Sequence, residues 1–148
     1  IIGGRYVGLE FGQMFRRFGS DVTIVHRDDH ILSREDADVS DGLQKAPEKE
    51  GIRFFKQEES YTSKASFLDK DSVPVWSKDD RTHYRFSGKR ITRGLYQSKA
   101  GRCIHSDING ALNTLEKSRV VELDESLKVK TPILLEVQKR KAVASRIA

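Results

Sequence analysis

Residues 1–25 read IIGGRYVGLEFGQMFRRFGSDVTIV, and this stretch decides the fold class. An apolar start at Ile1-Ile2 runs into Gly3-Gly4, which is a turn signal. Apolar residues then recur at helical spacing from residue 7 to 18, and Gly19 supplies a stop for that helix. Residues 22–25 form a short β-branched run, typical of a buried parallel strand. The stretch therefore predicts strand, helix and strand in succession.

The next thirty residues repeat this alternation. Ser33, with Asp36 three residues later, resembles a helix start, and residues 39–50 are predicted to be helical. Pro47 removes a backbone donor there and is expected to kink or shorten the helix. Residues 52–55 then predict a third strand. Strands alternating with helices at this spacing indicate a parallel α/β sheet of Rossmann-like βαβ type.

Composition limits the protein class. The 148 residues allow one ordinary domain or two small ones, and no apolar run approaches the ~20 residues that span a bilayer. One cysteine excludes an internal disulfide framework and a multi-cysteine zinc site. No signal peptide precedes Ile1, so we expect no membrane partner, a cytoplasmic location, and a piece of something longer.

Charge divides the chain near residue 55. Residues 1–55 carry a net charge of −2 and residues 56–148 a net charge of +7, which together give the formal +5. The second part is less regular: residues 58–80 are predicted to be loop with short strands, and residues 107–117 to be a short helix. The uneven charge indicates two segments with different partners, although a solvated lysine-rich surface is the alternative.

The first segment resembles the NAD(P)-binding βαβ unit of pyridine nucleotide-disulfide oxidoreductases, which include lipoamide dehydrogenase and mercuric reductase. The resemblance extends from the quoted run to about residue 55. In this fingerprint one glycine makes a tight turn, a second admits the pyrophosphate, and a third permits close helix–strand packing. Gly3 and Gly8 match the first and third positions, whereas Arg5 stands at the second. The cofactor-binding residues implied by the resemblance are Gly3, Gly4, Gly8, Glu10, His26 and Arg27.

Two departures affect the expected cofactor, which is NAD or NADP. His26 stands where the family usually carries an acidic residue for the ribose, and Arg27 follows it. This pair either favours a 2′-phosphate or reflects decay of the site. Glu10 matches a glutamate that the resemblance places near the nicotinamide. The family's redox-active cysteine pair, flavin-binding region and dimerisation domain are absent from the sequence.

The second segment resembles the C-terminal, RuvC-like part of TnpB/OrfB transposon-encoded nucleases, often called transposases. The resemblance rests on GIRFFKQEESYTSKASFLD, FSGKRITRGLY and IHSDINGALNTLEK, over residues 51–118. It implies an RNase H-like fold and a Mg²⁺ site of three carboxylates, of which Asp107 is the last and the candidate catalytic residue. Asp107 is also expected to cap a helix, with Asn109 and Asn113 one turn apart. We expect no zinc at Cys103 and His105.

A basic stretch in this segment is the candidate nucleic-acid surface. Its cations are interleaved with Tyr96, a combination that suits phosphate backbones and base stacking. We expect weak, nonspecific binding of DNA or RNA. The residues concerned are Lys89, Arg90, Arg93, Lys99 and Arg102.

These observations predict three parts: a Rossmann-like fragment over residues 1–55, an incomplete and partly disordered nuclease fragment over 56–118, and a basic tail over 119–148. The first functional hypothesis is a transposase fragment that binds nucleic acid without cutting it, since one carboxylate cannot organise a two-metal site. The second is an NAD(P)/FAD-dependent oxidoreductase fragment with a damaged dinucleotide site. The third is a chimeric frame with no independent activity.

Overall fold

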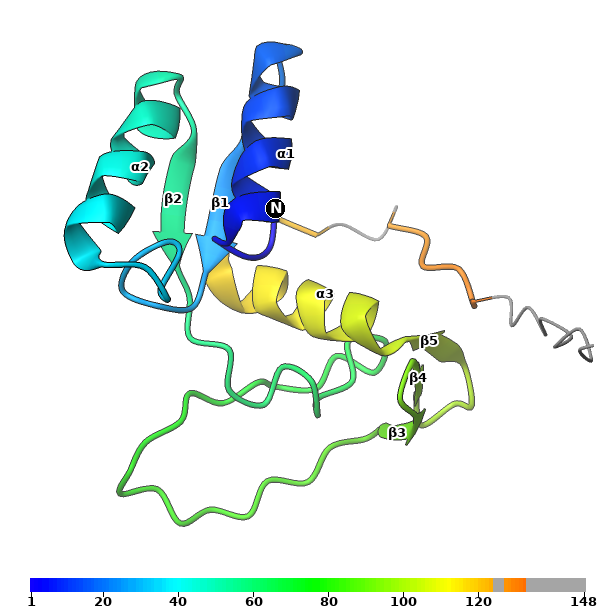
Figure 1. The fold of residues 1–148 in the computed structure, drawn as a ribbon. Coiled ribbons are helices and arrows are strands. Elements are labelled where there is room, and N and C mark those ends of the chain that lie inside the picture. The colour runs from blue at the N-terminus through cyan, green and yellow to red at the C-terminus, as the bar shows by residue number, and fades with distance from the viewer. Residues whose placement is uncertain (124–126, 133–148) are drawn as a thin grey trace, which may run out of the picture.

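The computed structural model describes residues 1–123 and 127–132. The N-terminal part contains α1 (Tyr6–Arg17), β1 (Thr23–His26), α2 (Ala37–Lys49) and β2 (Arg53–Lys56) (Figure 1). The remainder contains β3 (Lys89–Thr92), β4 (Leu95–Gln97), β5 (Cys103–His105) and α3 (Ser106–Ser118). Most of the predicted basic tail lies outside the described residues.

The N-terminal part is a small parallel α/β unit. β1 and β2 pair in parallel, from Thr23 opposite Arg53 to His26 opposite Lys56. Ile2 forms a parallel bridge with Val25 on the other side of β1, and the Gly3 N–H donates to the Val25 carbonyl at 2.7 Å. The first three residues thus serve as the first strand of a βαβαβ order. This confirms the mixed α/β prediction for the segment.

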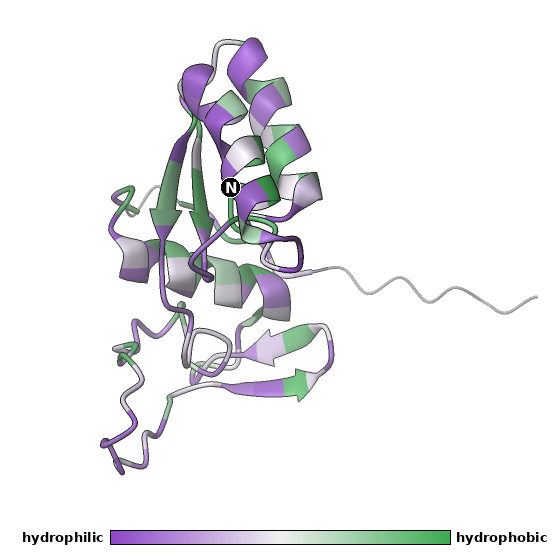
Figure 2. Cartoon of the chain, turned by 60° about the vertical axis from the view of Figure 1, so that its left-hand side comes forward, coloured by the Kyte–Doolittle hydropathy of each residue, from purple (hydrophilic) through white to green (hydrophobic). Residues whose placement is uncertain are grey.

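The two helices of this unit contact each other and lie to one side of the strands (Figure 2). The core consists of buried aliphatic residues from every layer: Leu9, Val22, Ile24, Ile31 and Ile52. α2 runs through Pro47 to Lys49, so the expected shortening does not occur. Because the proline lies in the last turn, few backbone bonds remain for it to disrupt.

α1 forms where the periodicity predicts, but its large apolar side chains face away from the sheet. The exposed residues are Val7, Phe11, Met14, Phe15 and Phe18, and the buried ones are Leu9 and Gly12. A Cβ added at Gly12 would approach Ile24 Cδ1 to 3.0 Å. The helix therefore packs on β1 through its glycine side, where only small residues allow so close an approach.

The second part is an antiparallel meander followed by a helix. β3 pairs with β4 through an irregularity between Arg90 and Thr92, and β4 pairs with β5 from Leu95 opposite His105 to Gln97 opposite Cys103. α3 packs on β4 and β5. In both ribbon views α3 crosses below the carboxyl ends of β1 and β2 (Figures 1 and 2).

Candidate functional site

The amino end of α1 forms the centre of the candidate dinucleotide site. Arg5 is its N-cap, with extended backbone at φ −90° and ψ 170°, and its side chain makes no capping hydrogen bond. The first helical bond runs from the Leu9 N–H to the Arg5 carbonyl at 3.0 Å. The amides of Tyr6, Val7 and Gly8 therefore have no acceptor within the helix. The first turn carries no acidic residue, so this positive helix end is open to an anion.

Glycines hold this turn against the strands. Gly3 has φ +109°, a conformation that favours glycine. A Cβ on Gly8 would lie 2.2 Å from the Gly3 carbonyl oxygen, and one on Gly4 would lie 2.9 Å from the Cβ of His26. Gly3, Gly4 and Gly8, which the resemblance implies as cofactor-binding residues, thus lie around one turn, and each is favoured there by its backbone conformation or by lack of space for a Cβ.

Arg5 and Glu10 are both exposed. The backbone angles of Arg5 are ordinary, so an arginine occupies the second fingerprint position without strain. Glu10 lies one turn into α1, and its side chain makes no hydrogen bond within the described residues. The structure thus places Arg5 beside the free amides and Glu10 further along the helix.

The carboxyl end of β1 provides the other half of the candidate site. A cavity of about 490 Å³ opens there, and Arg27, Asp28 and Ser33 line it together with Lys56 from β2. The Arg27 Nε donates to Asp28 at 3.1 Å, and the Ser33 hydroxyl donates to the same carboxylate at 2.6 Å. These two donors, Ser33 first, hold the pKa of Asp28 below its usual value. A ligand in this cavity would meet a charge pair rather than a free cation.

His26, the last residue of β1, is buried, with 7% of its surface exposed. Its Nδ1 has no hydrogen-bond partner within the described residues. Burial lowers the pKa of His26 and outweighs the opposing effect of Asp28. The imidazole is therefore neutral at pH 7 and adds no positive charge to the site.

The second part of the molecule reaches this same edge of the sheet. The Gln57 N–H donates to the His26 carbonyl at 2.7 Å, which continues the strand pairing. Glu59 lies near Arg27 and Asp28, and burial raises the pKa of its carboxyl group. The residues that follow β2 thus lie beside the carboxyl end of β1.

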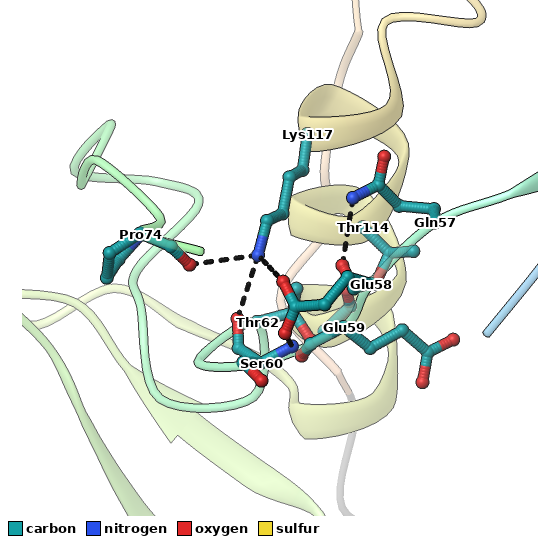
Figure 3. Close-up of polar contacts among 9 residues, drawn as sticks. Gln57, Glu58, Glu59, Ser60, Thr62, Pro74, Thr114 and Lys117 are labelled. Atoms are coloured by element: carbon teal, nitrogen blue, oxygen red, sulfur yellow. Dashed lines mark hydrogen bonds and ion pairs between the residues drawn. The ribbon is translucent and has the colours of Figure 1, made fainter. Parts of the chain in front are cut away.

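A buried lysine that no sequence pattern indicates connects this segment to α3. The Lys117 side chain is 7% exposed and donates from Nζ to the Glu58 carboxylate, to the Ser60 carbonyl at 3.2 Å and to the Pro74 carbonyl at 2.9 Å (Figure 3). Burial alone would raise the pKa of Glu58, but hydrogen bonds from Lys117 and Ser60 keep it below its ordinary value. In Figure 3 the Glu59 carboxylate points away from this cluster. No local pattern could have indicated a contact between residues 59 positions apart.

The predicted metal residue lies outside any cluster of ligands. The side chain of Asp107 is 87% exposed, and within the described residues no group of three or more His, Cys, Asp or Glu side chains could hold a metal ion. The expected helix cap is also wrong: His105 is the N-cap of α3, and its Nδ1 accepts from the Asp107 N–H at 3.3 Å. The Mg²⁺ prediction therefore has no support.

Asn109 and Asn113 are buried and structural. Asn109 accepts from the Phe67 N–H at 3.0 Å and donates to the Ala65 carbonyl at 2.8 Å. Asn113 donates to the carbonyls of Thr62 and Ala65, both at 2.8 Å. Their one-turn spacing thus ties α3 to a loop that has no regular secondary structure of its own.

The predicted nucleic-acid residues gather on the meander. All five are exposed, on β3, on the β3–β4 and β4–β5 turns, and beside β5: Lys89, Arg90, Arg93, Lys99 and Arg102. Cys103 and His105 are half-buried on β5, where the Cys103 thiol lies 3.8 Å from the Gly101 carbonyl. No helix of the described residues is long and apolar enough to cross a membrane.

The strand and helix order of the N-terminal segment is that of a Rossmann-like unit. The family model described as pyridine nucleotide-disulphide oxidoreductase matches residues 1–66. Mercuric reductase of Lysinibacillus sphaericus is 36% identical over 56 residues, which is 38% of this chain and 10% of that protein. Dihydrolipoyl dehydrogenase of Thermus scotoductus is 45% identical over 53 residues, 36% of this chain and 12% of that protein. The chain thus spans about a tenth of the length of these relatives, and no solved structure matches it significantly.

These matches correct the first functional hypothesis. The family match and the relatives point to an oxidoreductase fragment, which was the second hypothesis, so the transposase assignment is wrong. The RuvC-like assignment of the second segment has no support either from the family model or from the relatives named above. The predicted domain boundaries and the hypothesis of a chimeric frame without activity stay predictions.

Proposed function

We propose that residues 1–66 bind a nicotinamide dinucleotide, with the pyrophosphate at the amino end of α1. The observation that carries the proposal is the uncapped helix end, whose free amides follow a glycine turn beside the carboxyl ends of parallel strands. Ligands of open α/β sheets bind at such an edge. The oxidoreductase family match supports the same assignment.

Within this site, Arg5 adds a cation beside the phosphates and the cavity after β1 receives the adenosine ribose. NAD fits this cavity better than NADP, because Asp28 already engages Arg27 and neutral His26 supplies no charge for a 2′-phosphate. The paired Asp28 carboxylate can accept a hydrogen bond from a ribose hydroxyl. A bound nicotinamide would accept or donate hydride, but the single cysteine of this chain cannot form the dithiol pair of a disulfide reductase.

Calorimetric titration of the full chain with NADH and NADPH tests this function. We expect NADH to bind more tightly than NADPH, and Asp28→Asn to raise NADPH affinity because it releases Arg27. Asp79→Asn, an exposed aspartate of the second part, is the charge-matched control. Tighter binding of NADPH by the unchanged chain would contradict the NAD assignment. Lack of binding of either nucleotide at millimolar concentration would overturn the proposed function.

A further inference from the structure

Two adjoining cavities on the second part form a cationic groove that the dinucleotide site does not use. The first, of about 410 Å³, is lined by Ser63, Lys64, Phe86, Gly88, Lys89, Arg90 and Tyr96. The second, of about 490 Å³, shares Phe86, Gly88 and Lys89 with it and extends to Lys99. Because the two cavities share three lining residues, they adjoin, and we call the pair the groove.

The charge in this groove has one sign. Lys64, Lys89, Arg90 and Lys99 line it, no carboxylate lines it, and none of the four forms an ion pair within the described residues. The cavity after β1 contrasts with it, since Arg27 and Lys56 are each paired there with an aspartate. Exposed cations that form no ion pair attract polyanions.

Two carboxylates near the groove are occupied in shaping its walls. Asp71 accepts from the Ser87 N–H at 2.9 Å and from the Ser87 hydroxyl at 2.6 Å. Asp69 accepts from the Lys99 N–H at 2.9 Å. Both aspartates therefore hold the loops that carry the cations, and their oxygens are directed to backbone and hydroxyl donors.

The floor of the groove is closely packed. Tyr96 is 1% exposed, and its hydroxyl donates to the Lys64 carbonyl at 2.7 Å. A Cβ on Gly88 would lie 2.5 Å from the Tyr96 ring, so bare backbone covers the ring at this point. A ligand thus meets a preformed surface with a half-buried Phe86 ring in the shared wall.

We propose that this groove binds a linear chain of phosphates, in the form of single-stranded nucleic acid. The four cations are distributed over two adjoining cavities, and this arrangement suits successive phosphates better than one compact anion. The Phe86 ring in the shared wall offers a stacking surface for a base. The proposal concerns binding alone and is independent of the dinucleotide site.

Fluorescence anisotropy of the full chain with a labelled oligothymidylate, across a salt series, tests the proposal. We expect binding at low salt, and Lys89→Gln/Arg90→Gln to weaken it at least tenfold and to reduce the slope of log K against log salt by about 1.4, since each phosphate contact on single strands contributes about 0.7. Lys45→Gln/Lys49→Gln on α2 removes the same charge from another element and should have little effect.

Competition experiments distinguish binding of a nucleic acid from binding of any chain of phosphates. An abasic oligonucleotide and inorganic polyphosphate should each displace the probe less effectively than the oligothymidylate, because neither stacks on Phe86. Equal displacement by polyphosphate would overturn the nucleic-acid assignment. Absence of binding at low salt, or equal weakening by the α2 control, would overturn the groove itself. Circular dichroism verifies the fold of each variant.

Discussion

At the scale of single residues, the fingerprint glycines are defined by what surrounds them. Gly8 faces the Gly3 carbonyl oxygen so closely that no side chain fits between α1 and the first turn. Gly42, in the middle of α2, faces open space. Replacement by alanine is therefore expected to change the stability of the protein in opposite directions at these two helical glycines.

Gly8→Ala should destabilise the protein by about 1–3 kcal/mol, because the backbone must shift to admit the Cβ. It should also weaken dinucleotide binding, since the shift moves the free amides. Gly42→Ala should instead stabilise by about 0.5–1 kcal/mol through helix propensity. Urea unfolding of the three proteins checks this. Equal effects of the two substitutions would contradict the close packing at Gly8.

His26 predicts a pH dependence of stability. Burial lowers the pKa of this residue below its ordinary 6.5, so protonation favours the unfolded chain. Its contribution to stability is present above pH 6.5 and is lost as the pH falls below that value. Chemical unfolding between pH 7.5 and 5 should show this loss, and His26→Gln should reduce it. His83→Gln, at an exposed position, is the control and should leave the profile unchanged.

Asn109 and Asp107 test the structural interpretation of α3. Asn109→Ala removes the partner of the buried Phe67 N–H and should cost about 1–3 kcal/mol. Asp107→Asn changes an exposed carboxylate and should shift the unfolding free energy by no more than about 0.5 kcal/mol. A large loss of stability from Asp107→Asn alone would contradict the exposed position described here.

At the scale of elements, Lys117 joins α3 to the two loops it contacts. Lys117→Met leaves the Ser60 and Pro74 carbonyls without their donor and the Glu58 carboxylate without its cation, so it should cost about 1–3 kcal/mol. Hydrogen exchange should rise in residues 58–66 and in α3, while β1 keeps its protection. Lys45→Met, on the exposed face of α2, is the matched control. Faster exchange confined to α1 and α2 would contradict the assignment.

The sequence predicts most elements because their signals are local. The expected helix at residues 7–18 is α1, the expected strands at 22–25 and 52–55 are β1 and β2, and the expected helix at 107–117 is α3. The periodicity could not show which side of α1 is buried, because large apolar residues indicate a core face only when space exists for them. Here the glycines bring the helix so close to β1 that the large residues remain outside.

The sequence predicts only those parts of the candidate sites that are encoded by neighbouring residues. Gly3, Gly4 and Gly8 follow from a contiguous motif, and the structure places them around one turn. The pairing of Arg27 with Asp28 and the burial of His26 depend on a loop conformation that no periodicity describes. The bonds of Lys117 to Glu58, Ser60 and Pro74 join distant segments, so only the folded chain reveals them.

At the scale of the whole molecule, the charge division near residue 55 separates two kinds of surface. The cations beside the first unit's cavity are neutralised by neighbouring aspartates, whereas those of the meander groove are free within the described residues. The division thus reflects the local pairing of charges as well as their number. The two units meet where Gln57 extends the pairing of β1 and where α3 crosses the sheet edge (Figure 1).

The central claim is that the amino end of α1 receives the phosphates of a nicotinamide dinucleotide. The most direct measurement is an NMR titration of the isotope-labelled full chain with NADH, read at individual backbone amides. We predict saturable shifts at the amides of Gly4–Gly8 and at Arg27, with the amides of β3 unmoved. Absence of shifts at the amino end of α1 at millimolar NADH, or shifts confined to the meander, would contradict the account.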